Sequence, residues 1–157
     1  MFFILDDAPA SYEVLTARAN PIETFDTAFM HGTFRKGGEF TYVVSHSAEI
    51  NSNPEFTYIF ENATVTFDSN REDMIRAVFR DGTVREYGPV STPEQMGQKN
   101  LYMAQCVEQD TPVRCSVEEV LPFSTVCEEV FAHPEKFQVF PPDQVRYTGP
   151  MYQMPGL

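Results

Sequence analysis

The sequence predicts an α+β fold: a single, mostly antiparallel β-sheet with helices packed on one face. Three observations lead to this prediction. Segments in which apolar and polar residues alternate, joined by tight turns, fill the first half of the chain. Two segments with helical spacing and N-terminal capping signals follow them. Several strands carry apolar residues on both faces, so helices on one face would leave the other face open for a partner.

About seven strands are expected, within residues 11–20, 24–34, 40–50, 55–60, 64–69, 74–79 and 83–88. In the second of these, Phe25, Phe29 and His31 fall on one face, and Asp26 and Met30 fall on the other. The glycines of "RKGGE" and "RDGT" mark two hairpin turns, because glycine adopts positive φ without steric cost. Tight turns between successive strands indicate antiparallel pairing.

Both expected helices open with a capping signal. Thr92 is followed by proline at the first helical position, and Ser116 is followed three residues later by Glu119. Pro122 should kink or shorten the second helix, because proline removes a backbone donor. The Pro-rich tail, residues 135–157, should be extended.

The opening residues, "MFFILDDAP", leave two interpretations open. Residues 1–5 could form a short strand or helical turn tucked under the core, or the last turn of a helix whose beginning is missing. They are too few for a membrane helix or for the apolar region of a secretory signal, and no Lys or Arg precedes them. Otherwise residues 1–157 are expected to form one domain.

The composition indicates which classes of partner the chain is unsuited to bind and which compartment it belongs to. The chain has 23 acidic against 11 basic residues and a net charge of −12, so nucleic acid and anionic membranes are poor partners. The odd cysteine count (Cys106, Cys115 and Cys127) and the lack of a C-x-x-C pair indicate reduced thiols in a cytoplasmic protein.

Catalytic and metal motifs are weak in this sequence. His31 and His46, on neighbouring expected strands, could join Asp26 and Glu23 in a metal site, but no H-x-H or H-E-x-x-H spacing occurs, and we expect no metal. Ser45-His46-Ser47 lacks a nucleophile elbow. The eight glycines never fall in the order that cradles a dinucleotide, so no cofactor is expected to bind this chain in the usual way.

A resemblance emerges from two stretches, "ANPIETFDTAFMHGTFRKGGEFTYVVSHSAEINSNPEFTYIFENATVTF" and "QKNLYMAQCVEQDTPVRCSVEEVLPF". In order and spacing they resemble the carboxy-terminal domain of the Gfo/Idh/MocA oxidoreductases, from Ala19 to about Phe131. That family consists of NAD(P)-dependent dehydrogenases of sugars and polyols. Its members have a Rossmann domain followed by an α+β domain whose open sheet carries substrate and subunit contacts. The resemblance therefore implies that residues 1–5 are the remnant of a helix preceding this domain.

The sequence departs from the family by lacking the cofactor glycines, the E-K-P lysine motif and the D-x-G-x-H motif, so no catalytic residue is carried over. The resemblance implies a substrate-binding and dimerisation domain whose Rossmann domain, with NAD or NADP, is missing. A homodimer or higher oligomer would form through the open sheet face. Substrate contacts are predicted at Glu23, Asp26 and His46, which could instead make only strand-edge hydrogen bonds. The alternative function is a stand-alone, non-enzymatic dimeric binding protein.

Overall fold

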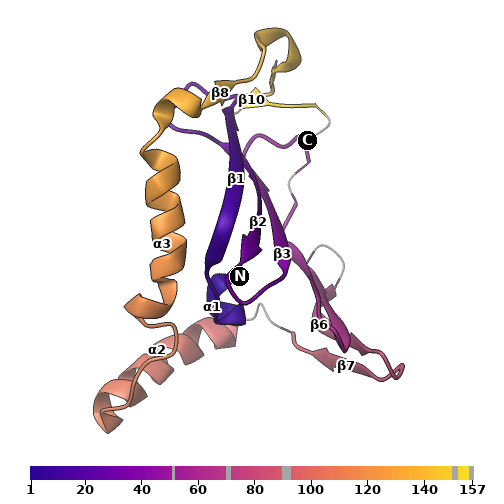
Figure 1. Ribbon diagram of the computed structural model, residues 1–157, viewed down its shortest axis with the longest axis vertical. Coiled ribbons are helices and arrows are strands. Elements are labelled where there is room, and N and C mark those ends of the chain that lie inside the picture. Colours follow the sequence, from indigo (N-terminus) through magenta and orange to yellow (C-terminus); the bar gives the residue numbers. More distant parts are fainter. Residues whose placement is uncertain (51, 70–71, 90–92, 150–151, 156–157) are drawn as a thin grey trace. The chain divides into compact units, whose positions relative to one another are not determined.

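The computed structural model describes residues 1–50, 52–69, 72–89, 93–149 and 152–155 (Figure 1). The chain divides into two compact units: unit 1 is Met1–Ile50 with Arg114–Leu157, and unit 2 is Asn51–Val113. Helices and mostly antiparallel strands make up both, so the α+β class is confirmed. In these parts of the chain, no helix has the length and apolar character needed to cross a membrane.

Unit 1 is built on a four-stranded sheet in the order β3-β2-β1-β8. Its elements are α1 (Phe2–Leu5), β1 (Pro9–Arg18), β2 (Thr27–Phe34), β3 (Glu39–Ser45), α3 (Val117–Phe131), β8 (Gln138–Val139), β9 (Arg146–Tyr147) and β10 (Tyr152–Gln153). The first three strands pair antiparallel, whereas β8 pairs parallel to the end of β1. Gly37 and Gly38 have φ of 98° and 96° in the β2–β3 turn, which confirms the predicted hairpin.

An aromatic core lies between this sheet and α3. Phe2, Phe34, Phe40 and Val126 are buried there, and the Phe2 ring meets the other two rings edge-on at 6.1 and 5.6 Å. The residues of β1 to β3 in this core or packed against it are all even-numbered: Tyr12, Met30, Phe34 and Phe40. The alternation of faces predicted from the sequence is therefore confirmed in unit 1.

Tyr12 also joins the sheet to α3 through a polar contact. Its hydroxyl donates a hydrogen bond to a carboxylate oxygen of Glu129. Burial raises the pKa of Tyr12 to about 12, and the bond to Glu129 acts in the same direction, because both favour the protonated phenol.

The start of α3 confirms the predicted capping box. The Ser116 side chain accepts a hydrogen bond from the Glu119 backbone, and the Glu119 carboxylate accepts one from the Ser116 backbone at 2.7 Å. Of the two effects predicted for Pro122, a kink or a shorter helix, the shortening does not occur, because the helix continues through it to Phe131. Pro122 stands only six positions after the cap, so it removes just one hydrogen bond near the helix start. The predicted cap at Thr92 lies outside the described residues.

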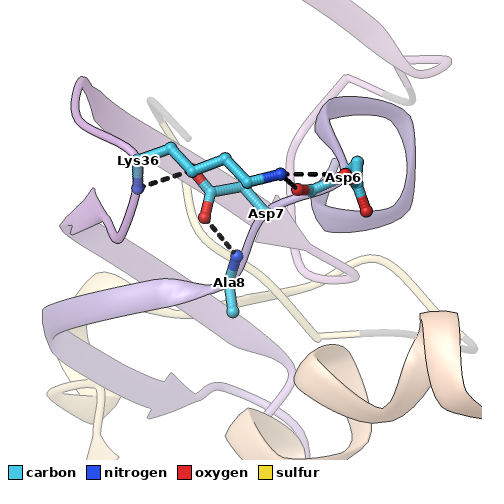
Figure 2. Close-up of polar contacts among 4 residues, drawn as sticks. All are labelled: Asp6, Asp7, Ala8 and Lys36. Carbon is cyan, nitrogen blue, oxygen red and sulfur yellow. Dashed lines mark hydrogen bonds and ion pairs between the residues drawn. The ribbon is translucent and has the colours of Figure 1, made fainter.

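The opening residues form a helical turn, α1, rather than a strand. The β2–β3 hairpin holds this turn, as Figure 2 shows. The Lys36 backbone donates to Asp7 Oδ2 at 3.0 Å, and the Lys36 ammonium pairs with Asp6 Oδ2 at 2.8 Å. The other oxygen of Asp7 accepts from the backbone of Ala8 at 2.8 Å. These contacts and the buried Phe2 ring make residues 1–8 an integral part of unit 1.

Unit 2 contains a second four-stranded sheet and one helix. Its elements are β4 (Glu55–Ile59), β5 (Ala63–Asp68), β6 (Glu72–Phe79), β7 (Val84–Tyr87) and α2 (Pro93–Gln109), and the strands pair antiparallel in sequential order. Gly82, with φ of 84°, lies in the predicted β6–β7 turn. Phe56, Phe67 and Ile75 follow one another in register across one face of this sheet.

The prediction of a single sheet is wrong. The described strands form two four-stranded sheets and a two-stranded one, β9 with β10. The connection between β3 and β4 explains the division: residues 46–54 are mostly polar and end in a proline, so no tight turn places β4 beside β3. The two strands are therefore edge strands of separate sheets.

Candidate functional site

The three predicted substrate residues lie at one end of the unit 1 sheet. Glu23 and Asp26 belong to the loop between β1 and β2, residues 19–26, and His46 directly follows β3. The strand register brings these places together, because Thr27 at the start of β2 pairs with Ala17 near the end of β1 and with Ser45 at the end of β3. Antiparallel pairing therefore gathers segments that are 20 residues apart in the sequence.

Asp26 is buried, with 5% of its surface exposed. Its Oδ2 accepts hydrogen bonds from the backbones of Ala19 and Asn20 at 3.0 and 2.9 Å and from the Asn20 side chain at 2.8 Å. Its Oδ1 accepts one from the Thr27 hydroxyl at 3.2 Å. Both carboxylate oxygens are thus engaged by groups of the same chain.

The pKa of Asp26 lies below its ordinary value. Burial by itself raises the pKa of a carboxyl group, but hydrogen bonds from Asn20, Ser47 and the Ala19 backbone to the charged form outweigh it. Asp26 is therefore an ionised acceptor at neutral pH. It makes the strand-end hydrogen bonds that were the alternative to substrate contact.

Two residues that take part in the hydrogen bonds around Asp26, Asn20 and Ser47, were not identified as site residues from the sequence. The Ser47 side chain has no exposed surface, and its hydroxyl accepts a hydrogen bond from Asn20 Nδ2 at 2.9 Å. Asn20 Oδ1 in turn accepts from the backbone of Tyr152 at 3.1 Å. Asn20 stands before a proline, a pair that indicates only a turn, and nothing in the local pattern distinguishes Ser47 from an exposed serine. We call Asn20, Asp26, Thr27, Ser45 and Ser47 the anchor network.

Glu23 and His46 are exposed beside the anchor network. Within the described residues, neither side chain makes a hydrogen bond or an ion pair, so both can meet a ligand from solvent. The backbone of His46 is held in place, because its amide donates to the Asp26 carbonyl at 2.7 Å. Substrate contact through Glu23 and His46 stays a prediction.

His31 is separate from this site. It lies within β2, where its Nδ1 is 3.1 Å from the hydroxyl of Thr41. In the described parts of the chain, no group of three or more His, Cys, Asp or Glu side chains is placed to hold a metal ion.

The face of the unit 1 sheet that points away from α3 carries an apolar row. Leu15, Phe29 and Val43 pair across β1, β2 and β3, and 61%, 41% and 60% of their surfaces are exposed. Glu13 and His31 flank the row in the next register position. These three large apolar side chains therefore form an exposed apolar row on this face of the sheet.

A hollow of about 430 Å³ lies at the other end of unit 1. It is lined by Phe2, Asp6, Asp7, Ala8, Arg35, Lys36, Glu118, Glu119 and Pro122. Most of its charged groups are engaged already: Asp6 with Lys36, Asp7 with two backbone amides, and Glu119 in the capping box. The hollow therefore offers a ligand few free polar groups.

Comparison with solved structures identifies the fold. UDP-N-acetylglucosamine 3-dehydrogenase GnnA from Acidithiobacillus ferrooxidans matches 83% of this chain with a TM-score of 0.65 and 12% identity. Aldose-aldose oxidoreductase from Caulobacter crescentus, complexed with glycerol, matches 86% with a TM-score of 0.65 and 14% identity. No protein-family model and no curated protein matches the chain.

The chain spans about 42% of the length of each of these two proteins. The matched portion lies outside the Rossmann domain, and the parts of the chain that the structure describes contain no evident cofactor domain. The resemblance to the carboxy-terminal domain of Gfo/Idh/MocA oxidoreductases is thereby confirmed at the level of fold.

Proposed function

We propose that this chain is the substrate-binding and dimerisation half of an NAD(P)-dependent oxidoreductase that acts on a sugar or polyol. The observation that supports this most is the fold match over 83% of the chain to 42% of a sugar-nucleotide dehydrogenase. A domain of this kind forms one wall of a substrate cleft, and a Rossmann domain forms the other. The complete enzyme would move a hydride between the nicotinamide and an alcohol carbon.

The residues of this chain do not fit a nicotinamide cofactor. Its glycines never take the G-x-G-x-x-G order, and the described strands include no parallel pair joined by a crossover helix of the dinucleotide-binding kind. The cofactor and the acid/base groups would therefore come from the Rossmann portion. This chain would bind and orient the substrate.

In the proposed substrate site, the side chains of Glu23 and His46 contact hydroxyl groups of the substrate. Asp26 holds the backbone segments that carry these two residues. A carboxylate and an imidazole suit a polyhydroxy ligand, because together they accept and donate hydrogen bonds. The anchor network fixes the backbone on both sides: Asp26 accepts from Ala19 and Asn20 and, through its carbonyl, from His46. Asp26 is thus a positioning residue in this proposal.

Ligand titration followed by NMR tests the substrate role. UDP-N-acetylglucosamine, UDP and glycerol would be added to the isotope-labelled chain, and we expect shifts for amides in residues 19–26 and 45–48. His46→Ala should weaken binding, and the matched control His133→Ala, an exposed histidine after α3, should not. Equal binding by the wild type and the His46 variant would remove His46 from the site.

Self-association through the apolar row is the second part of the proposal. A second copy would cover Leu15, Phe29 and Val43 with the same row of its own, as two-fold symmetric interfaces require. Val43→Glu should dissociate the dimer, because it places a charge in the apolar row that the second copy would cover. The matched control is Val117→Glu on α3, where valine is 76% exposed. In sedimentation equilibrium, a wild-type monomer at high concentration would count against dimerisation.

The alternative is a stand-alone, non-enzymatic dimeric binding protein. The closed aromatic core of unit 1 favours it, because that core needs no other domain. An antibody against this chain would give the mass of the native polypeptide. A much longer product supports the oxidoreductase, and a product starting at Met1 supports the stand-alone protein.

A further inference from the structure

The end of the chain returns to the anchor network. The Met154 backbone donates to the Ser47 carbonyl at 2.8 Å, and residues 48 and 154 form a parallel bridge. Met154 is buried, although most of the tail before it is exposed. We call residues 152–154 the C-terminal strap.

Asn20 binds the strap as a neighbouring strand would. Its Oδ1 accepts from the Tyr152 backbone at 3.1 Å, and its Nδ2 lies 3.5 Å from the Tyr152 carbonyl. The orientation of the amide is set by chemistry, because only a carbonyl oxygen can accept from a backbone N–H and only the NH₂ group can donate to Asp26. One side chain therefore bonds to the strap on one side and to the carboxylate of the anchor network on the other.

We propose that the C-terminal strap holds the β1–β2 loop and the segment after β3 in a single arrangement. When the strap is docked, the hydrogen bonds between Asn20 and Asp26 hold residues 19–26 in place. The bonds of Ser47 to Asn20 and to the Met154 backbone hold residues 46–48. Without the strap, Asn20 loses its backbone partner and Ser47 becomes accessible to water. The loop then opens locally while the paired strands remain intact.

Docking of the strap would determine whether the two substrate-contacting residues of the proposed site are held in place. Glu23 and His46 stand on the two segments that it holds, so its release would free both. This functional part rests on the proposed function, whereas the structural part does not. The amides of Ala19, Asn20 and His46 report the structural part directly, because each donates to Asp26.

Hydrogen exchange of the full chain, followed by mass spectrometry, tests the proposal. Met154→Ala removes the buried anchor of the strap. Exchange should become about tenfold faster in residues 19–26 and 46–48 and stay unchanged in β2. The matched control is Met103→Ala, the same change at a half-exposed methionine of α2. Unchanged exchange in residues 19–26 of the Met154 variant would overturn the proposal.

Asn20→Leu provides a second test, because it keeps the approximate size of the side chain and removes its bonds to Tyr152, Asp26 and Ser47. The Met154 amide should then exchange faster; if this variant fails to fold, Met154→Ala decides alone. Ligand titration separates the two proposals. A wild type that binds no sugar ligand, with faster loop exchange in Met154→Ala, contradicts the function and supports the strap. Sugar binding with unchanged loop exchange does the reverse.

Discussion

Unit 1 and unit 2 each carry a four-stranded sheet but differ in how many large apolar side chains they bury. In unit 1, three phenylalanines and a valine form a closed core between the sheet and α3. In unit 2, Ala77 and Cys106 are the apolar side chains that are buried among the described residues. Its Phe56, Tyr58 and Phe67 rings contact one another at 4.9 to 5.4 Å on the sheet face but remain half-buried.

The difference indicates that the two sheets are stabilised in different ways. A sheet needs a covered apolar face for independent stability, and α3 supplies that cover in unit 1. The aromatic face of unit 2 has the amino-acid composition of a protein core, but its side chains are less buried than those in the core of unit 1. We therefore expect unit 1 to set the stability of the isolated chain, and unit 2 to gain most from association with another protein.

The largest expected effect is in the unit 1 core. Phe40 is 5% exposed and contacts two other rings, so Phe40→Ala should lower the free energy of unfolding by about 3–5 kcal/mol. Phe60→Ala, at a ring 49% exposed after β4, should cost less than about 1 kcal/mol. Urea unfolding followed by circular dichroism measures both. Equal losses would break the comparison between the units.

Removing the charge of the anchor network should have the next largest effect. Asp26→Asn keeps the shape but turns an NH₂ group toward buried donors, so we expect a loss of about 2–3 kcal/mol in the free energy of unfolding. The same unfolding experiment measures it. A loss below that of Phe60→Ala would show that the network adds no stability to unit 1.

Acid should act through the same residue. Because the pKa of folded Asp26 lies below that of an unfolded aspartate, about 4, its contribution is fully present above that pH. It is lost as the pH falls from there through the folded pKa, because the proton binds the unfolded chain more tightly. The free energy of unfolding of the wild type should therefore fall more than that of Asp26→Asn between pH 7 and pH 3. Parallel pH profiles would assign the acid sensitivity to other groups.

A smaller effect is expected at the start of α3. Ser116→Ala removes one half of the capping box and should cost about 1 kcal/mol. Because α3 covers the core, the loss should appear in the transition of unit 1. Hydrogen exchange of strands β1 to β3 against β4 to β7 would show which unit responds. A response in both would indicate that the two units unfold together.

The smallest expected effect is a gain in unit 2. Gly97 lies within α2, and beyond its chain neighbours and the backbone of its own helix a β-carbon added there would meet no atom within 4 Å. Gly97→Ala should therefore stabilise α2 by about 0.5–1 kcal/mol, because alanine loses less backbone freedom than glycine. Slower amide exchange confined to residues 98–109 would support separate stabilisation of the units, and slower exchange in β1 to β3 would contradict it.

Much of the local structure could be predicted from residue pattern. The strands of residues 24–34 and 55–60, the turns at Gly37 and Gly82 and the capping box at Ser116 follow from contacts between residues close in sequence. Their physical causes are local: side-chain alternation, positive φ and a hydroxyl acceptor for a helix N-terminus. The apolar row was also anticipated in kind, because alternation alone places large side chains on the second face.

The candidate site could be predicted only in part. Glu23, Asp26 and His46 were selected as polar residues near strand ends, and the register does bring their segments together. The burial of Asp26 could not be foreseen, because it depends on Asn20, Ser47 and a tail segment more than 100 residues away. Single-sequence patterns contain no signal for such a pairing.

The sequence by itself determined the α+β class, the hairpins, the helix starts and the acidic character of the chain, because each arises from composition or from neighbours within a few residues. Only the tertiary structure decided the division into two sheets, the continuation of α3 through Pro122 and the docking of the tail on Asn20. In these cases burial and hydrogen bonding between distant segments outweigh local preference, and that free energy does not exist until the chain has folded.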